Sequence, residues 1–139
     1  MSPVRKVLFL CTSNSCRSQM AEAIVNARYP GWQAFSAGAR PSGQVHPNTL
    51  RVLEEIGIQH HGESKSVERF RNEYFDLVVT VCDEASEECP VWMGQGSRLH
   101  ANFVDPAKAG GTDEERLGAF RKVRDEMLLR LPDLLNSPR

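Results

Sequence analysis

The chain has 139 residues and a formal net charge of −1, with 17 basic and 18 acidic residues. It contains no run of lysines or arginines, so the composition gives no sign of a nucleic-acid partner. The longest apolar stretch is far too short to span a membrane and lacks a signal-peptide pattern, so we expect a cytoplasmic protein with no membrane partner. We also expect one domain over residues 1–139, acting as a monomer.

Apolar periodicity in the first half of the chain predicts two strands and two helices. Residues 6–10 form an apolar run typical of a buried strand, and residues 18–27 have the periodicity of a helix. Residues 33–36 predict a short strand. A helix over residues 47–56 then begins at a proline and ends before Gly57, as helices commonly do. Its predicted buried face carries Leu50, Leu53 and Ile56.

The second half continues the alternation of strands and helices. Residues 75–81 are rich in β-branched side chains, as expected of a strand that is buried on both faces. Residues 99–104 predict a weaker strand, and residues 112–131 a helix that Thr112 and Glu115 begin with a capping box. This alternation implies an α/β fold with a parallel sheet covered on both faces. Apolar residues of the last helix recur at helical spacing: Leu117, Phe120, Val123, Met127 and Leu131.

The most informative motif is a cysteine, five residues and an arginine, from Cys11 to Arg17, between the first predicted strand and helix. Backbone N–H groups of such a loop, and the helix N-terminus after it, favour a bound anion. They also favour a reactive thiolate at Cys11, while the guanidinium can hold two oxygens of a tetrahedral oxyanion. The alternative is a buried structural cysteine beside a surface arginine. The predicted oxyanion-binding loop comprises Thr12, Ser13, Asn14, Ser15, Cys16, Arg17 and Ser18.

Three residues of this loop have a second, more ordinary explanation. Asn14 can hold the loop in shape through hydrogen bonds to the backbone, but it is also a common turn residue. Ser18 can donate its hydroxyl to the Cys11 thiolate, but it is also a common helix-cap residue. Cys16 either fills space in the loop or acts as an oxidation partner for Cys11.

Cys11, Cys82 and Asp105 each lie just past a predicted strand. Because ligands of parallel sheets bind outside the carboxyl ends of the strands, we expect these three residues at one edge of the sheet. Asp105 precedes Pro106, so it is either a plain turn residue or a carboxyl group that protonates a departing oxygen.

Cys82 and Cys89 lie seven residues apart. On a helix both thiols would face the same way, but about 10 Å apart along the axis, so a disulfide would require the helix to unwind. Two structural cysteines, a zinc site and a thiol relay are the alternatives. In the relay, Cys82 resolves a bond to Cys11, and Cys89 resolves a bond to Cys82. The residues between them either form a solvated helix face or slow thiolate formation, and the acidic ones are Asp83, Glu84, Glu87 and Glu88.

Five segments together resemble the arsenate reductases built on the low-molecular-weight protein tyrosine phosphatase fold: residues 11–18, 36–38, 76–82, 89–90 and 105–106. The resemblance extends over residues 5–130. It implies a three-layer α/β fold with a four-stranded parallel sheet flanked by helices. It also implies reduction of arsenate to arsenite with electrons from thioredoxin.

The resemblance further implies a role for each catalytic residue. Cys11 attacks arsenic while Arg17 and the loop amides hold the oxyanion, and Asp105 assists the loss of hydroxide. Cys82 then attacks Cys11 and releases arsenite. Cys89 attacks Cys82, which leaves an exposed Cys82–Cys89 disulfide for thioredoxin to reduce.

Two positions depart from the family pattern. Ser13 stands where phosphatases of this fold usually have glycine. Lys65 stands where some thioredoxin-coupled reductases have an acid that helps to bind potassium, although Asn14, Glu22 and Ser36 match the rest of that site. Because a lysine would repel a cation, we do not predict potassium at this site. We also expect no other metal and no cofactor.

A protein tyrosine phosphatase is the alternative enzyme, since Cys11, Arg17 and Asp105 suffice for it. Cys82 and Cys89 discriminate between the two activities, because a hydrolase does not need them. A third hypothesis is a non-catalytic oxyanion-binding or redox-sensing module, which would have a reactive Cys11 but no turnover.

Overall fold

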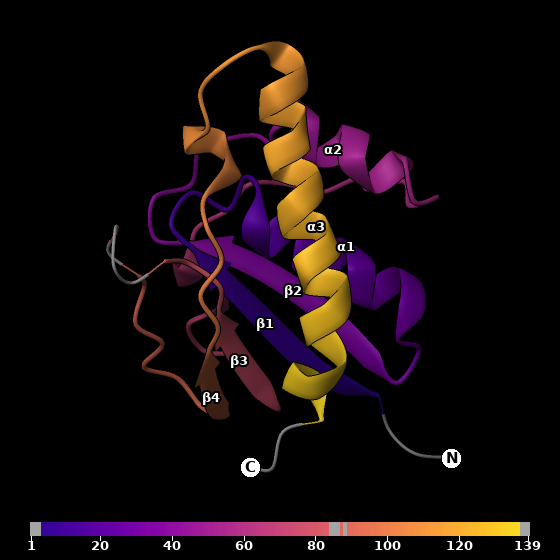
Figure 1. Cartoon of the computed structure of the whole chain (residues 1–139). Helices are drawn as coiled ribbons and strands as arrows, with labels where there is room; N and C mark the ends of the chain where they lie inside the picture. The colour runs from indigo at the N-terminus through magenta and orange to yellow at the C-terminus, as the bar shows by residue number, and fades with distance from the viewer. Residues whose placement is uncertain (1–3, 84–86, 88, 137–139) are drawn as a thin grey trace.

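A computed structural model of the chain describes residues 4–83, 87 and 89–136. Four strands form one sheet in the order β2-β1-β3-β4, and every neighbouring pair is parallel (Figure 1). The predicted four-stranded parallel sheet is therefore confirmed. The strands are β1 (Arg5–Cys11), β2 (Trp32–Gly38), β3 (Leu77–Thr80) and β4 (Ser97–His100).

Helical segments follow β1, β2 and β4 in the chain, which confirms the predicted α/β fold. The last helix begins at the predicted capping box: Thr112 Oγ1 accepts from Glu115 N at 3.1 Å, and Glu115 Oε1 accepts from Thr112 N at 3.0 Å. The α-helices are α1 (Arg17–Arg28), α2 (Pro47–Glu54) and α3 (Asp113–Leu135), and two short 3-10 helices are η1 (Val67–Phe70) and η2 (Pro106–Lys108).

Alternate side chains of β1 enter different cores on the two faces of the sheet. Val7 and Phe9 pack on the face that α1, α2 and α3 cover. Leu8 and Leu10 pack on the other face, against a cluster of aromatic side chains around Phe75. The four β1 side chains are fully buried, and η1 with its adjoining loops gives the second face a thinner cover than the three α-helices give the first.

The order of the strands places Cys11 at the point where the sheet can bind a ligand. From β1 the chain crosses to β2 on one side, and it later returns to β3 on the other side. Ligands of open α/β sheets bind where the strand order reverses in this way, outside the carboxyl ends of the strands. Cys11 is the last residue of β1 and therefore lies at the edge of this site.

The weaker strand lies earlier than predicted. Instead of residues 99–104, β4 covers Ser97–His100, which pair one by one with the four residues of β3. The apolar signal came from Ala101 and Phe103, both only 2% exposed. Ala101 N still donates to Thr80 O at 2.9 Å, but both residues lie beyond the last paired position, and their burial in the core explains their apolar character.

The buried face of α2 also differs from the prediction. The helix ends at Glu54, so Ile56 lies outside it, and the buried residues are Thr49, Val52 and Leu53. Thr49 turns inward because its hydroxyl donates a hydrogen bond to the carbonyl of Ser15, at 3.1 Å. The long-range contact with the loop after β1 therefore rotates the face that apolar periodicity predicted.

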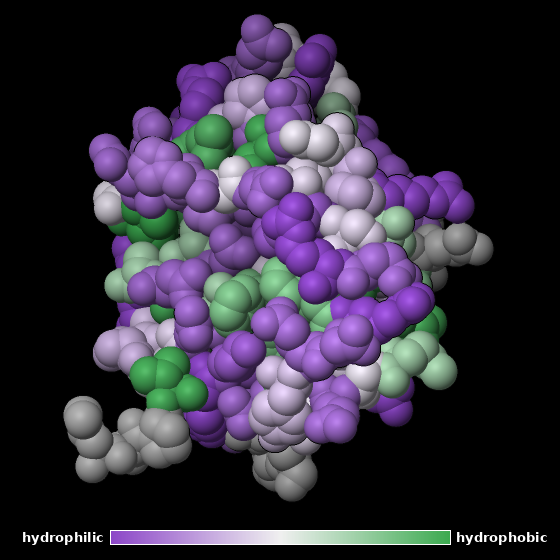
Figure 2. All heavy atoms as spheres, turned by 180° about the vertical axis from the view of Figure 1, so that it is seen from behind, coloured by the Kyte–Doolittle hydropathy of each residue, from purple (hydrophilic) through white to green (hydrophobic). Residues whose placement is uncertain are grey.

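Hydrophilic side chains predominate on the face seen in Figure 2, where apolar side chains form small separate groups. The 23-residue helix α3 carries charged pairs along its exposed side, such as Arg130 with Glu126. Within the described residues, no helix combines the length and the apolar character needed to cross a bilayer.

Candidate active site

The loop after β1 turns four consecutive carbonyl groups outward, where they accept hydrogen bonds from other segments. Across a trans peptide, the C=O of one residue and the N–H of the next point in opposite directions. The N–H groups of residues 13–16 therefore turn toward the centre of the loop, as expected of an anion-binding site. The outward carbonyl oxygens accept from these donors: Thr12 O from Arg40 N (2.8 Å), Ser13 O from Ser42 N (3.0 Å), Asn14 O from Gln19 Nε2 (3.2 Å) and Ser15 O from His46 N (3.1 Å).

Asn14 holds the tightest point of this loop. Its φ angle of 52° lies in the left-handed region, which asparagine tolerates better than most residues. Its buried Oδ1 accepts from Lys65 N and from Gln19 Nε2, both at 3.0 Å. Gly38 at the end of β2 packs closely here, since a Cβ atom would lie 2.7 Å from the carbonyl oxygen of Thr12. Gln19 was not predicted to support the loop, because the sequence shows only an amide within the predicted helix.

The thiol of Cys11 lies next to the hydroxyl of Ser18, with 2.9 Å between sulfur and oxygen. Asn14 Nδ2 donates to the same hydroxyl oxygen, at 2.8 Å. Because the oxygen already accepts from Asn14, the serine hydrogen is available to the sulfur, and a thiolate gains from that donor. The structure thus brings the side chains of Cys11, Asn14 and Ser18 together.

Lys65 occupies the region where the family resemblance implies a potassium ion. Its ammonium lies 3.8 Å from Glu22 Oε1 and 3.4 Å from Ser36 Oγ. Burial lowers the pKa of Lys65, and it raises the pKa of Glu22. These residues do not fit a potassium ion, because a tethered positive charge already faces the carboxylate. Among the described residues, no group of three or more His, Cys, Asp or Glu side chains is arranged to hold a metal.

Arg17 lies at the closed end of the loop with only 2% of its side chain exposed. Nη1 donates to the carbonyl of Phe103 at 3.1 Å, and both Nη atoms donate to the carboxylate of Glu87. The Nε atom is buried and has no acceptor in the part of the chain that the structure describes. A buried guanidinium that faces a loop of N–H groups can bind an oxyanion.

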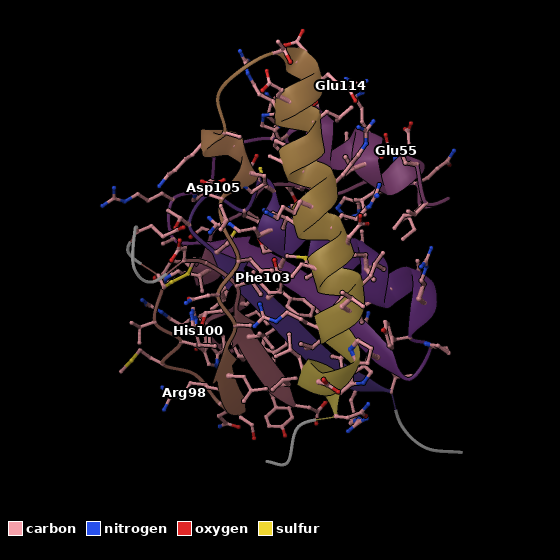
Figure 3. All side chains as sticks on the ribbon, in the orientation of Figure 1. Glu55, Arg98, His100, Phe103, Asp105 and Glu114 are labelled. Carbon is pink, nitrogen blue, oxygen red and sulfur yellow. A yellow bond between two sulfur atoms is a disulfide. The ribbon has the colours of Figure 1, made fainter. Side chains whose placement is uncertain are left out.

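Asp105 has the contacts expected of a turn residue and also those expected of a carboxyl group that protonates a departing oxygen. Its Oδ1 accepts from Ala107 N at 3.0 Å, so it caps η2. Its Oδ2 lies 3.8 Å from Arg17 Nη2, so the same carboxyl group faces the loop (Figure 3). The turn therefore positions Asp105 at the site, and the two interpretations do not exclude each other.

Cys16 lies in the loop but differs sharply from a reactive thiol. Burial raises the pKa of Cys16 to about 12, although contacts with Thr49 and Ser15 partly oppose that effect. Cys16 is therefore protonated at neutral pH, and a protonated thiol is a poor nucleophile. This favours the interpretation of Cys16 as a residue that fills space.

A disulfide joins Cys82 and Cys89, with 5.9 Å between their Cα atoms. The described residues of this segment are not helical, as a bond at this spacing requires. Both sulfurs are engaged, so in this form they cannot ligate zinc. The disulfide is not exposed as the resemblance implies: Cys82 is fully buried and Cys89 is half-buried, because both pack against the core.

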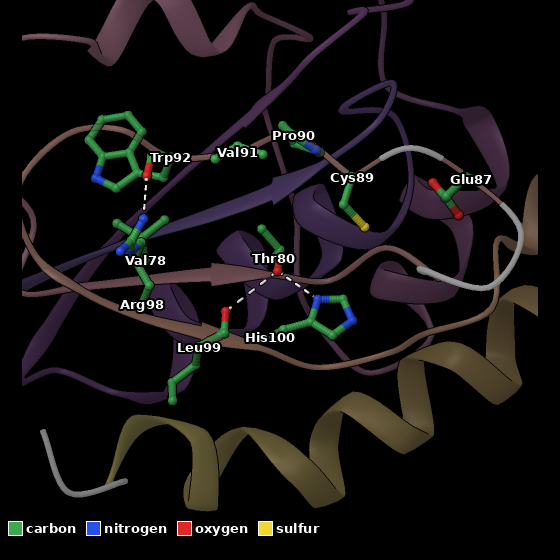
Figure 4. A pocket seen from close by; sticks show the side chains of 10 residues that line it. All are labelled: Val78, Thr80, Glu87, Cys89, Pro90, Val91, Trp92, Arg98, Leu99 and His100. Atoms are coloured by element: carbon green, nitrogen blue, oxygen red, sulfur yellow. Dashed lines mark hydrogen bonds between the residues drawn. The ribbon is translucent and has the colours of Figure 1, made fainter.

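A cavity of about 530 Å³ borders Cys89. Figure 4 shows Cys89 and Glu87 along one side of this cavity, with Thr80, Leu99 and His100 from β3 and β4 on the other side. The cavity gives a small reagent or a partner side chain access to the bonded sulfur of Cys89.

Glu87 is not part of a solvated helix face, which was one expectation for the acidic run. Its side chain is 8% exposed and contacts Arg17 and Thr12. Burial raises the pKa of Glu87, but the hydrogen bonds from Arg17 and Thr12 outweigh burial and bring it to about 2. Glu84 and Glu88 lie outside the described residues.

The chain matches the family model described as low molecular weight phosphotyrosine protein phosphatase over residues 6–137. The arsenate reductase of Halalkalibacterium halodurans is 45% identical over 87% of this chain and 88% of its own length. A solved arsenate reductase in the oxidised state has a TM-score of 0.75 at 28% identity, covering 95% of this chain and 97% of the other. A thioredoxin-dependent arsenate reductase of Corynebacterium glutamicum has a TM-score of 0.60 at 25% identity, and the match covers 94% of this chain and 63% of the other. The chain therefore belongs to the low molecular weight phosphotyrosine protein phosphatase family and, within it, groups with the relatives named arsenate reductase.

Proposed function

We propose that this chain reduces arsenate to arsenite through a relay of three thiols, with electrons from thioredoxin. The observation that carries the proposal is the Cys82–Cys89 disulfide in a segment that contacts the oxyanion loop. A hydrolase has no use for a second and a third thiol. Relatives named arsenate reductase, one of them described as thioredoxin-dependent, support the same activity.

In the first step the loop amides and Arg17 bind the oxygens of arsenate above Cys11. The Cys11 thiolate, which Ser18 stabilises from 2.9 Å, attacks arsenic and forms a sulfur–arsenic bond. One arsenic–oxygen bond breaks in exchange. Asp105 faces Arg17 and supplies a proton to the departing oxygen, which leaves as water.

In the second step Cys82 attacks the sulfur of Cys11. A disulfide forms between them, and the electron pair of the sulfur–arsenic bond stays on arsenic, which is thereby reduced and leaves as arsenite. Cys89 then attacks Cys82, and Cys11 returns to its thiolate form. The product of this exchange is the disulfide seen in the structure.

In the last step a dithiol resets the enzyme. Cys82 is fully buried and Cys89 borders a cavity, so the attacking thiolate reaches Cys89 first. The dithiol supplies two electrons and two protons and itself becomes a disulfide. Thioredoxin provides such a dithiol in the reducing cytoplasm, which is the location predicted from the sequence.

The decisive assay measures arsenate-dependent NADPH consumption in the presence of thioredoxin and thioredoxin reductase. Hydrolysis of a small aryl phosphate is measured beside it. We expect sustained NADPH consumption by the wild type. Hydrolysis without arsenate turnover would favour the phosphatase alternative, and the absence of both activities would favour a non-catalytic binding module.

Cys89→Ser is the matched control, because it keeps Cys11, Arg17 and Asp105 and removes only the last thiol of the relay. This variant should release one arsenite per molecule and consume almost no NADPH, because Cys11 and Cys82 supply the two electrons of that single turnover. Any hydrolysis of the aryl phosphate should continue, since water resolves a phosphocysteine without the relay.

A further inference from the structure

Glu87 places a carboxylate against two side chains of the oxyanion loop, those of Arg17 and Thr12. Its Oε2 lies 2.6 Å from Arg17 Nη1, and its Oε1 lies 2.8 Å from Arg17 Nη2, so the guanidinium binds both oxygens. Thr12 Oγ1 also donates to Oε1, at 2.5 Å. Glutamate is seldom buried unless it is paired, and here one arginine and one hydroxyl of the loop pair with it.

This carboxylate and a substrate oxyanion need the same donors. Two parallel charge-assisted hydrogen bonds make the Glu87–Arg17 contact one of the stronger kinds of polar interaction in proteins. A tetrahedral oxyanion above Cys11 requires the same planar fork of Arg17. Nη1 already gives its two hydrogens to Phe103 O and to Glu87, so a substrate can bind both Nη atoms only if Glu87 leaves.

The disulfide constrains the segment that carries Glu87. Glu87 belongs to the ring that the Cys82–Cys89 bond closes, and its N–H donates to the carbonyl of Asp83 at 3.1 Å. Asp83 N in turn donates to Glu87 Oε2 at 3.2 Å. The bond holds the two cysteine Cα atoms 5.9 Å apart, whereas helical spacing would separate them by about 10 Å along the axis. Opening the bond removes the constraint that presents the carboxylate to Arg17.

We infer that Glu87 is an internal, redox-controlled ligand of the oxyanion loop. While Cys82 and Cys89 are bonded, the carboxylate occupies Arg17 and excludes the substrate oxyanion. When a dithiol reduces the bond, it donates two electrons and two protons, two thiols form, and the carboxylate leaves the loop. The inference rests on the proposed function, because it takes this loop to be the arsenate site.

Such a ligand separates the two halves of the catalytic cycle. In the oxidised protein Cys11 is a free thiol, but Cys82 is not available to resolve an arsenic adduct. Arsenate that reacted at this stage would block Cys11 without forming product. Linkage gives the converse effect: a bound oxyanion favours the reduced form, because only that form offers it Arg17.

Inorganic phosphate is a suitable probe, since it shares the shape and charge of arsenate and thiols do not reduce it. Its affinity is measured by titration calorimetry for the oxidised and the dithiothreitol-reduced protein. We expect the reduced wild type to bind phosphate at least roughly tenfold more tightly than the oxidised wild type, as one charge-assisted hydrogen bond would give. In Glu87→Gln the ratio of the two affinities should fall close to one.

Glu114→Gln is the charge-matched control. Glu114 pairs with Arg121 on the exposed side of α3 (Figure 3), so this variant removes one carboxylate without touching the loop. It should keep the wild-type ratio. Phosphate binding by the reduced Glu87→Gln protein shows that the variant has folded.

The remaining outcomes separate this inference from the proposed function. If phosphate binds neither form of the wild type, the loop is not an oxyanion site and both proposals fail. If phosphate binds both forms equally, the loop is an oxyanion site, but Glu87 does not control it. If Glu87→Gln keeps the wild-type ratio, another part of the oxidised segment excludes phosphate, and the inference is wrong.

Discussion

Asn14 Nδ2 donates a hydrogen bond to Ser18 Oγ at 2.8 Å, and this contact decides where the serine hydrogen points. With one lone pair committed to Asn14, the hydroxyl directs its hydrogen to the sulfur of Cys11, 2.9 Å away. The loop therefore carries a donor for the thiolate that does not depend on a bound substrate.

Replacement of Ser18 by alanine should slow the alkylation of Cys11 near neutral pH. A hydrogen bond to a charged group contributes about 1.5–3 kcal/mol, so we expect a loss of roughly tenfold or more in the rate with iodoacetamide. The measurement uses reduced protein and peptide mapping of the alkylated residue. Ser42→Ala, which removes an exposed hydroxyl that contacts Gln44, should react at the wild-type rate. Equal rates for both variants would show that Ser18 does not stabilise the thiolate.

Cys11→Ser should abolish both arsenate reduction and any aryl-phosphate hydrolysis, because a serine hydroxyl is far less ionised than a thiol.

Arg17→Lys should be severely impaired as well, since an ammonium cannot reproduce the two parallel contacts of the guanidinium fork. Initial rates with arsenate and thioredoxin measure both effects. Appreciable turnover by Cys11→Ser would remove the nucleophile from the mechanism, and a near-normal rate for Arg17→Lys would mean that other groups hold the oxyanion.

Cys16 should resist modification in the folded protein. Burial raises the pKa of Cys16 to about 12, so its thiolate is scarce at neutral pH. In the oxidised Cys11→Ser protein, Cys16 is the remaining free thiol. An aromatic disulfide reagent should detect almost no thiol in the native variant and one thiol per chain after denaturation. Rapid labelling without denaturation would contradict the assignment and would restore Cys16 as a candidate oxidation partner.

The predictable part of the site is the part that the chain builds locally. A strand, a loop and a helix follow one another between Arg5 and Arg28, so apolar periodicity and the motif from Cys11 to Arg17 were enough to place them. The topology argument placed Asp105 at the edge of the sheet that carries Cys11, and Asp105 lies near Arg17 there although β4 already ends at His100.

The parts that escaped prediction depend on contacts between distant segments. Glu87 lies 70 residues from Arg17 in the chain, and nothing in its local sequence distinguishes it from a solvated acid. Gln19 supports the loop through Asn14, and its partner Glu63 lies 44 residues away. Periodicity reports which side chains are apolar, but it does not report which buried polar groups find one another.

The Glu87–Arg17 pair gives the oxidised protein a defined acid sensitivity. The hydrogen bonds from Arg17 and Thr12 outweigh burial and lower the pKa of Glu87 from 4.5 to about 2. A carboxylate with a lowered pKa stabilises the folded state fully above pH 4.5, and this contribution is lost as the pH falls toward about 2. The oxidised wild type should therefore have a higher Tm than oxidised Glu87→Gln near neutral pH.

The difference in Tm between these two proteins should shrink as the pH falls below 4.5. Asp105, which also faces Arg17, is present in both proteins, so the comparison isolates the carboxylate of Glu87. Differential scanning calorimetry over a series of acidic buffers provides the measurement. A difference that did not change with pH would show that the charge of Glu87 contributes nothing to stability.

Counting products separates the thiol relay from simple hydrolysis. Cys89→Ser is reduced, freed of other thiols and given arsenate. Cys11 and Cys82 remain, so each molecule should release one arsenite and stop as a Cys11–Cys82 disulfide. Cys82→Ser should release little or none, because its arsenic adduct lacks the resolving thiol. Arsenite is counted by chromatography, and the disulfide is located by mass spectrometry of peptides.

Oxidation of the wild type and of Cys89→Ser tests whether the segment between the two cysteines changes shape. On a helix, Cys82 and Cys89 are too far apart to bond, so oxidation of the wild type should reduce its helix content and increase protease cleavage between residues 82 and 96. Cys89→Ser cannot form this bond and should show neither change under the same oxidation. If Cys89→Ser turned over repeatedly with thioredoxin, the third thiol would lie outside the pathway, and a mechanism with two cysteines would replace the relay.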